Sequence, residues 1–229
     1  MRLLGPPSKL NSATIRQGNL LFNSNWFVRA ELLDLFADVI LFGEFTLASG
    51  AASPYYLDAR SVTLQPKPLK NIAELMLVYA QNNNFHLVAG PATAAIPIVT
   101  SLVLLGKGQI DGGLYVRSEA KKHGTKQVVE GAPFRKGDRC LVVDDVITSG
   151  GSLIACVQTL REAGLDVTDV VTLVDRSGGK ASSNLREIGV NLDSIFRIEE
   201  ILAQAESRLT PIKLENGEIV VVAGKGYES

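Results

Sequence analysis

The segment 139–152 constrains the fold of this chain more than any other stretch of the sequence. A short apolar run bounded by charge, residues 140–143, is typical of a buried strand in a parallel sheet. Asp144 and Asp145 follow it at the carboxyl end, where open α/β sheets bind their ligands. A loop of small residues, 148–152, then leads into a periodic apolar pattern that predicts a helix. The order is therefore strand, acidic pair, loop and helix.

The chemistry of this loop favours an anion. Gly150 and Gly151 let the backbone approach a ligand closely, and the start of the following helix adds positive potential. Thr148, Ser149 and Ser152 add hydroxyl donors. This set suits a phosphate held beside carboxylates that accept hydrogen bonds from a sugar diol. The nucleotide P-loop pattern is absent, and a dinucleotide fingerprint would need its glycines before the acidic residue.

The run 142–150 resembles the phosphoribosyl-diphosphate signature of the type I phosphoribosyltransferases. A strand, a glycine turn and a helix alone would fit any buried strand, so the acidic pair and the hydroxyl loop carry the resemblance. It implies an α/β fold: the type I phosphoribosyltransferase fold, with a parallel sheet flanked by helices and a small hood. It also implies a set of residues that bind phosphoribosyl diphosphate, namely Asp144, Asp145, Val146, Ile147, Thr148, Ser149, Gly150, Gly151 and Ser152.

Length and composition set the frame around this motif. At 229 residues with 46% hydrophobic content, one α/β domain with attached pieces is favoured over two domains. A net charge of −1 gives no sign of a nucleic-acid or membrane surface. Cys140 and Cys156 fall in apolar patterns and are interpreted as core residues. No apolar run is long enough for a membrane span, and no signal peptide pattern opens the chain, so we expect a cytoplasmic protein.

The chain divides into three parts. Residues 1–24 carry no sustained period and are predicted to be an N-terminal extension, and residues 25–207 the phosphoribosyltransferase domain including its hood. Residues 208–229 are predicted to form a hairpin tail with an Asn-Gly turn that covers a sheet edge or a partner surface. Further helices are predicted at 27–40 (capped by Asn25), from Pro68 to 80, at 183–188 and at 199–207, and strands at 85–89, 113–117, 167–174 and 192–196.

Residues 42–60 predict a second device, a hairpin built from two β-type runs around a Ser-Gly turn. From the residues alone, its tyrosines would simply pack on the core. The segment is similar to the hood of orotate phosphoribosyltransferases, where a Ser-Pro-Tyr-Tyr element borders the pyrimidine. The resemblance implies that Tyr55, Tyr56, Thr148 and Arg176 bind orotate. A guanidinium suits its carboxylate because it offers a planar, bidentate fork.

The charged stretch 118–126 lies between two β-type runs and is either a solvated hairpin or a mobile lid. Its Arg-x-Glu-Ala-Lys-x-His-Gly pattern resembles the flexible catalytic loop of the orotate enzymes. This implies that Arg117, Lys121, Lys122 and His123 bind phosphoribosyl diphosphate, and that Lys121 and His123 are catalytic together with the acidic pair. In the family the loop reaches the neighbouring subunit's site, which implies a homodimer with the lid contributed in trans.

The chain departs from the family pattern at three positions. The turn 90–97 resembles the family's pyrophosphate loop, but Ala94 stands where some members have lysine. Ala48 replaces a lysine common in the hood, and Ser118 replaces a cation that usually follows Arg117 in the lid. Ser118 matters most, because a diphosphate leaving group needs charge neutralisation.

The expected reaction is transfer of the phosphoribosyl group to orotate, giving orotidine 5′-monophosphate and pyrophosphate in UMP biosynthesis. Mg²⁺ is the expected cofactor, bound mainly through the diphosphate, ribose hydroxyls and water, and no side-chain ligand is assigned to it. Two alternatives stay open. A transferase for another base is opposed by the Asp175-Arg176 and Ser-Pro-Tyr-Tyr elements. A non-catalytic sensor is favoured by the missing lysines and opposed by Lys121 and His123.

Overall fold

The computed structural model describes residues 25–46, 50, 52–117, 128–213 and 219–223. The predicted N-terminal extension, residues 1–24, lies outside them. So do the predicted lid, residues 118–126, and the predicted turn of the tail.

The predicted parallel sheet is confirmed, with one exception at its edge. Within the described residues the main sheet is six-stranded, in the order β5-β4-β3-β6-β7-β8. All neighbouring pairs are parallel except β4 and β5, two strands consecutive in the chain that pair antiparallel. The strands are β3 (Leu87–Pro91), β4 (Gly112–Val116), β5 (Val129–Gly131), β6 (Cys140–Ile147), β7 (Asp169–Asp175) and β8 (Asn191–Arg197).

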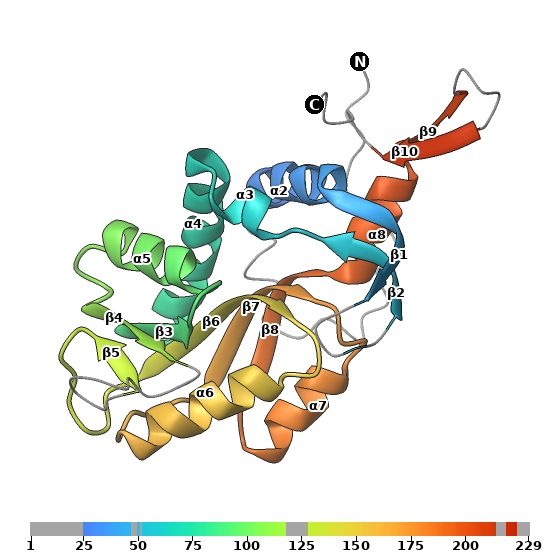
Figure 1. The fold of residues 1–229 in the computed structure, drawn as a ribbon. Helices are drawn as coiled ribbons and strands as arrows, with labels where there is room; N and C mark the ends of the chain where they lie inside the picture. Colours follow the sequence, from blue (N-terminus) through green and yellow to red (C-terminus); the bar gives the residue numbers. More distant parts are fainter. Residues whose placement is uncertain (1–24, 47–49, 51, 118–127, 214–218, 224–229) are drawn as a thin grey trace, which may run out of the picture.

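Helices cover both faces of this sheet (Figure 1). One face carries α6 (Gly151–Glu162) and α7 (Lys180–Glu187). The other carries α4 (Pro66–Asn82) and α5 (Ile96–Leu105), with α2 (Trp26–Asp38), the short α3 (Arg60–Thr63) and α8 (Ile198–Glu206). The side chains of β6 pack on both faces of the sheet: Leu141 and Val143 lie on the α4 side, and Cys140 and Val142 lie on the α6 side. A buried central strand therefore reads as a continuous apolar run.

The helices follow the predicted patterns with local differences. Helix α4 begins at Pro66, two residues before the predicted Pro68, and its predicted face is buried at Ile72 and Met76. Asn25 occupies the N-cap position of α2, but its side chain makes no capping hydrogen bond. Gly164 adopts φ +100° after α6, a conformation that favours glycine.

Two hairpins complete the described chain. The hood pairs β1 (Ile40–Thr46) with β2 (Ala52–Leu57) in antiparallel register, with an irregularity between Phe42 and Phe45. The tail pairs β9 (Leu209–Lys213) with β10 (Ile219–Ala223). Among the described residues the tail strands pair only with each other and do not extend the main sheet (Figure 1). A role for the tail against a partner surface stays a prediction.

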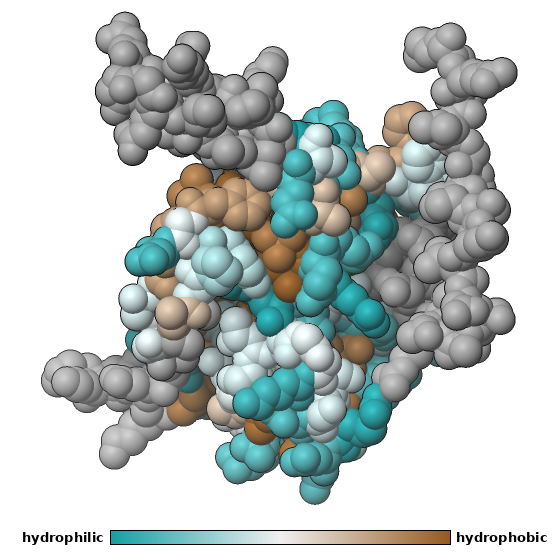
Figure 2. Space-filling view, turned by 90° about the vertical axis from the view of Figure 1, so that its right-hand side faces the viewer, coloured by the Kyte–Doolittle hydropathy of each residue, from teal (hydrophilic) through white to brown (hydrophobic). Residues whose placement is uncertain are grey.

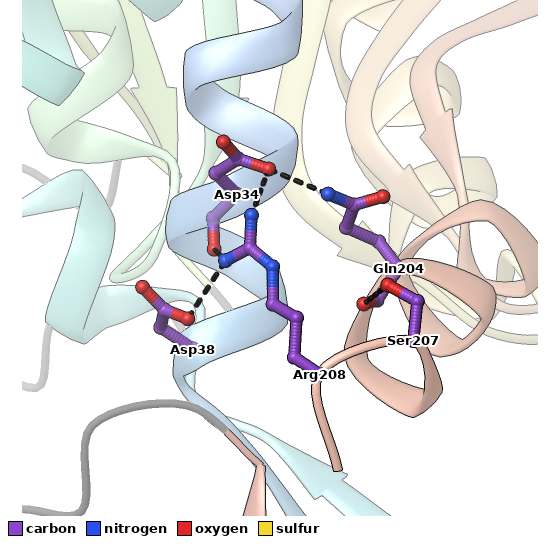
Figure 3. Close-up of polar contacts among 5 residues, drawn as sticks. All are labelled: Asp34, Asp38, Gln204, Ser207 and Arg208. Carbon is purple, nitrogen blue, oxygen red and sulfur yellow. Dashed lines mark hydrogen bonds and ion pairs between the residues drawn. The ribbon is translucent and has the colours of Figure 1, made fainter.

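The first and last helices of the domain are joined by polar contacts. Arg208 pairs with Asp34 and Asp38 of α2, and Gln204 of α8 donates to Asp34 over 2.7 Å (Figure 3). On the side of the molecule that carries the hood and α8, hydrophilic residues cover much of the described surface (Figure 2). Within the described residues no helix is long and apolar enough to cross a membrane.

Candidate active site

The carboxyl ends of the parallel strands bring the predicted site residues to one edge of the sheet. The register pairs Pro91 with Val116 across β3 and β4, and Ile147 with Asp175 across β6 and β7. Because β6 also lies directly beside β3, the segments that leave these four strands emerge at the same edge. The turn after β3, Arg117, the acidic pair with its loop and Arg176 are therefore neighbours in space.

The acidic pair combines burial with unused acceptor capacity. Asp144 is only 8% exposed and Asp145 is half-buried. The backbone N–H of Asp145 donates to Asp144 Oδ1 over 3.0 Å, and that of Val146 donates to Asp145 Oδ1 over 2.6 Å. Apart from a hydrogen bond between the two carboxyl groups themselves, no side chain of the described residues donates to either one. Their other oxygens are left to accept from a ligand.

Burial alters the protonation of this pair. Burial, and after it the neighbouring Asp145, raises the pKa of Asp144 to about 8. Burial also raises the pKa of Asp145, while the Val146 amide and the charge of Arg60 act in the opposite direction. A ligand that donates hydrogen bonds or brings a cation favours the ionised pair. The pair therefore suits a sugar diol accompanied by a metal ion.

The loop after β6 has the geometry predicted for anion binding. Gly150 adopts φ +85°, and α6 starts directly behind it. Thr148, Ser149 and Ser152 are exposed, and within the described residues their hydroxyls make no hydrogen bond. Asn184 of α7 donates to the Ser149 carbonyl over 3.0 Å, which ties the loop to the next helix. Backbone amides and hydroxyls at a helix start form a ready phosphate site.

Two predicted phosphoribosyl-diphosphate contacts still belong to the strand. Ile147 is buried and packs in the core on the α6 side, and Val146 is half-buried against the α4-side core. The Ile147 carbonyl accepts the backbone N–H of Arg176 over 2.9 Å. Ligand contacts by these two residues stay predictions.

The hood reaches the arginine predicted to bind the base. The Arg176 guanidinium carbon lies 4.6 Å from the centre of the Tyr55 ring, and its Nη2 donates to Ser53 Oγ over 3.5 Å. Arg176 Nε is buried and finds no acceptor among the described residues. The structure thus brings together Tyr55 and Arg176, which lie far apart in the sequence. Tyr56 instead lies beside Phe45, with ring centres 5.7 Å apart.

Arg117 stands at the end of β4, directly before the predicted lid. Its Nη1 lies 3.8 Å from Glu130 Oε1, and Tyr115 Oη donates to Glu130 Oε2 over 2.7 Å. Its Nε is buried without an acceptor among the described residues. The remaining lid residues, Lys121, Lys122 and His123, lie outside the described residues, as do the departures Ala48 and Ser118. Ala94 lies half-buried in the turn between β3 and α5.

Sequence reasoning gave no role to Arg60, which begins α3 after the hood. Tyr56 and Asp58 raise the pKa of Arg60, and its charge acts on Asp145. Its Nε lies 3.6 Å from Asp58 Oδ1. In the sequence, the Asp-Ala-Arg run after apolar Leu57 is the one sign of a role for Arg60. This run does not show that the end of the hood lies near the acidic pair.

The chemistry of the acidic pair fits Mg²⁺, which prefers carboxylate, hydroxyl and phosphate oxygens. Within the described residues there is no group of three or more His, Cys, Asp or Glu side chains that could hold a metal alone. A metal here would need oxygens supplied by a substrate.

Comparison with known proteins gives consistent matches. The model of the phosphoribosyl transferase domain family matches residues 59–207. The chain is 38% identical over 182 residues to the orotate phosphoribosyltransferase of Pyrococcus horikoshii, covering 78% of this chain and 95% of that relative.

Solved structures agree with the sequence matches. The crystal structure of orotate phosphoribosyltransferase from Aeropyrum pernix aligns with a TM-score of 0.65 at 35% identity, covering 78% of this chain and 98% of that one. The Mycobacterium tuberculosis orotate phosphoribosyltransferase in complex with 5-phospho-α-D-ribosyl 1-diphosphate aligns with a TM-score of 0.64 at 28% identity, covering 76% and 98%.

Proposed function

The chain belongs to the orotate phosphoribosyltransferases of the type I phosphoribosyltransferase family, and we propose how its own residues carry out the family's reaction. That reaction transfers the phosphoribosyl group from phosphoribosyl diphosphate to orotate and yields orotidine 5′-monophosphate and pyrophosphate, a step of UMP biosynthesis. The single observation that carries the proposal is the convergence of the acidic pair, the phosphate loop and Arg176 at one sheet edge.

The acidic pair and the loop hold the phosphoribosyl group. Asp144 and Asp145 accept hydrogen bonds from the ribose hydroxyls through the oxygens that their own chain leaves unused. The amides and hydroxyls of 148–152 bind the 5′-phosphate at the start of α6. Displacement at the anomeric carbon then passes through an oxocarbenium-like transition state. Positioning and charge stabilisation, rather than a covalent intermediate, supply the rate.

The hood and Arg176 hold the base. Arg176 pairs with the orotate carboxylate, a role supported by its buried and unpartnered Nε among the described residues. Tyr55 lies against the same guanidinium, so the ring and the arginine form one surface for the pyrimidine. The Thr148 hydroxyl contributes from the loop. Tyr56, on the other side of the hood, stays the weakest of the proposed base contacts.

Cations at the same edge neutralise the leaving diphosphate. Arg117 reaches the edge from β4, and Lys121, Lys122 and His123 follow it in the lid. Mg²⁺ bound through the substrate's oxygens and the acidic pair would supply further charge neutralisation. We also propose a cytoplasmic location, which the match to orotate phosphoribosyltransferases supports.

One assay tests the assignment. Orotate consumption is measured with phosphoribosyl diphosphate and Mg²⁺, beside uracil, hypoxanthine and adenine. Turnover with orotate and little with the other bases is expected. Turnover with another base would identify a different transferase. No turnover with any base, despite measurable diphosphate binding, would identify a sensor.

We further propose a homodimer whose lid acts in trans. Lys121→Ala inactivates the lid, and Asp144→Asn with Asp145→Asn inactivates the acidic pair. If the lid serves the neighbouring subunit, mixing the two inactive proteins creates sites that have both parts intact. Recovered activity approaching about a quarter of wild type per total site is expected for random mixing. Persistent inactivity in mixed dimers verified by mass would show that the lid serves its own chain.

A further inference from the structure

We propose that Ser53 is a positioning residue for base recognition, holding Tyr55 and Arg176 in one arrangement and thereby setting the preference for a base with a carboxylate. The inference rests on the proposed role of Arg176. Ser53 lies in β2 of the hood, and Arg176 follows β7, 123 residues later in the chain.

The hydrogen bonds of the Ser53 hydroxyl fix its orientation. Ser53 is 7% exposed, so bulk water does not satisfy its oxygen. Oγ donates its proton to the Tyr55 carbonyl over 2.7 Å, and it accepts the Tyr55 backbone N–H over 3.4 Å. With its proton committed to the hood, the oxygen is oriented as an acceptor for Arg176 Nη2, 3.5 Å away. One hydroxyl therefore shapes the hood locally and links it to the arginine.

The arginine is held on three sides. Its backbone N–H donates to the Ile147 carbonyl, its guanidinium stacks on Tyr55, and one Nη donates to Ser53. Among the contacts of the described residues, only the polar contact to Ser53 selects among rotations of the guanidinium over the ring, because stacking on an aromatic face tolerates such rotation. A bidentate pair with a carboxylate needs two N–H groups of the fork aimed together. Ser53 thus controls whether the fork is correctly aimed before orotate arrives.

The test compares Ser53→Ala with wild type in the full-length protein. The KM for orotate is expected to rise roughly fivefold, as for loss of one hydrogen bond, with the KM for phosphoribosyl diphosphate within about twofold of wild type. Ser53→Thr, which keeps the hydroxyl, is expected to restore orotate binding. Ser53→Cys keeps nearly the same size but is a poor acceptor, so it should raise the KM for orotate by a similar factor. It replaces Ser53→Ala in the test if the alanine variant folds badly.

Ser61→Ala is the matched control. Ser61 also donates to a backbone carbonyl, that of Asp58 over 2.6 Å, but it makes no contact with Arg176. It should leave the ratio of the two KM values unchanged. A proportional change of both KM values in Ser53→Ala would indicate a structural role and overturn the inference.

A double-mutant cycle separates the inference from the proposed function. In an Arg176→Ala background, Ser53→Ala is expected to have no further effect on the KM for orotate. A full additional effect would overturn the inference and leave the role of Arg176 standing. An unchanged orotate KM in Arg176→Ala alone would instead refute the proposed role of Arg176, and the inference with it.

Discussion

Two pairs of carboxylates, each with one buried and one half-buried member, lie at opposite edges of the same sheet and differ in the donors that surround them. Asp144 and Asp145 lie near the carboxyl end of β6. Among the described residues, these two carboxyl groups hydrogen-bond each other and accept backbone N–H groups of their own strand, but they receive no donor from another element. At the amino edge, Asp169 of β7 and Asp193 of β8 share Tyr79, whose Oη lies 3.0 Å from an oxygen of each.

The amino-edge pair is filled by donors from the protein itself. Asp169 also accepts from Thr168 over 2.6 Å and from Asn191 over 3.2 Å. A buried carboxylate that is saturated with internal donors ties secondary-structure elements together. A buried carboxylate whose oxygens lack some of their hydrogen bonds has an unfavourable free energy of desolvation, and a ligand that donates hydrogen bonds to it offsets that free energy. This difference supports a structural role for the amino-edge pair and the proposed ligand-binding role for the carboxyl-edge pair.

The largest expected effect comes from neutralising the carboxyl-edge pair. Asp144→Asn with Asp145→Asn keeps the size of both side chains and removes the charge that we propose faces the ribose. Turnover is expected to fall by at least roughly a hundredfold, while the melting temperature stays at or above that of wild type, because buried charge is removed. Steady-state kinetics and thermal melts measure the two effects. Near-normal turnover would contradict the ligand-binding role proposed for this pair, and with it the contrast to the amino-edge pair.

Arg176→Ala probes the same edge at the base. Loss of a charged hydrogen bond costs ~1.5–3 kcal/mol, or roughly ten- to a hundredfold in orotate affinity. Binding of phosphoribosyl diphosphate should be largely spared. Titration calorimetry with each ligand measures both. If the affinities for both ligands fell equally, Arg176 would have a structural role, like the residues around Tyr79.

Tyr79→Phe tests the amino edge. It removes one donor from the shared site, and the free energy of unfolding is expected to fall by about 1–3 kcal/mol. The KM values for both substrates should stay at wild-type levels, because the hydrogen bonds of Tyr79 lie at the edge of the sheet opposite the candidate active site. Denaturant unfolding and kinetics at 25 °C are the measurements. A variant with wild-type stability but altered KM values would reverse the roles assigned to the two edges.

The smallest expected effect, over a single pH unit, is a pH dependence of ligand binding at the carboxyl edge. The pKa of Asp144 is raised to about 8 in the folded protein, and in the binding mode that we propose its ionised form accepts the ribose hydroxyls. Phosphoribosyl diphosphate should therefore bind more weakly as pH falls below about 8, by at most about tenfold per pH unit. Asp144→Asn should remove this component, which separates it from titration of the ligand itself. An identical profile in the variant would exclude Asp144 as the group responsible.

The same shift has a consequence for stability. Between the ordinary carboxyl pKa and about pH 8, the unfolded chain has released a proton that the folded chain retains. The contribution of Asp144 to folding stability therefore falls as pH rises through this window and levels off above it. Unfolding measured in Asp144→Asn should lack this decline.

Most helices and strands, and the position of the acidic pair at the carboxyl edge, could be predicted because each depends on a local sequence pattern. The apolar run before Asp144 gives the strand, and a glycine followed by a periodic helix gives the loop. A β-type run was predicted after residue 126, but not its bounds or its antiparallel place in the main sheet, because the three-residue β5 leaves almost no periodicity.

The contacts that tune the site were missed for another reason. Ser53 and Arg176 are joined over 123 residues, and Tyr79 and Asp193 over 114. The residue types at such positions show chemistry, but pairing them requires knowing which strand neighbours which. The family resemblance supplied the base-binding role of Arg176 without showing what holds its side chain.

The polar contacts between α2 and α8 bear on how the chain reaches this fold during its synthesis. Arg29 bonds Glu200 across 171 residues, and Arg208 reaches Asp34 across 174. A ribosome therefore releases α2 long before the helix that it packs against has been made. The apolar face of α2, with Leu32 and Phe36 fully buried in the finished domain, lacks part of its cover until α8 has been made. A chain arrested before α8 would therefore already contain the acidic pair and Arg176 but would leave part of this apolar face exposed to water.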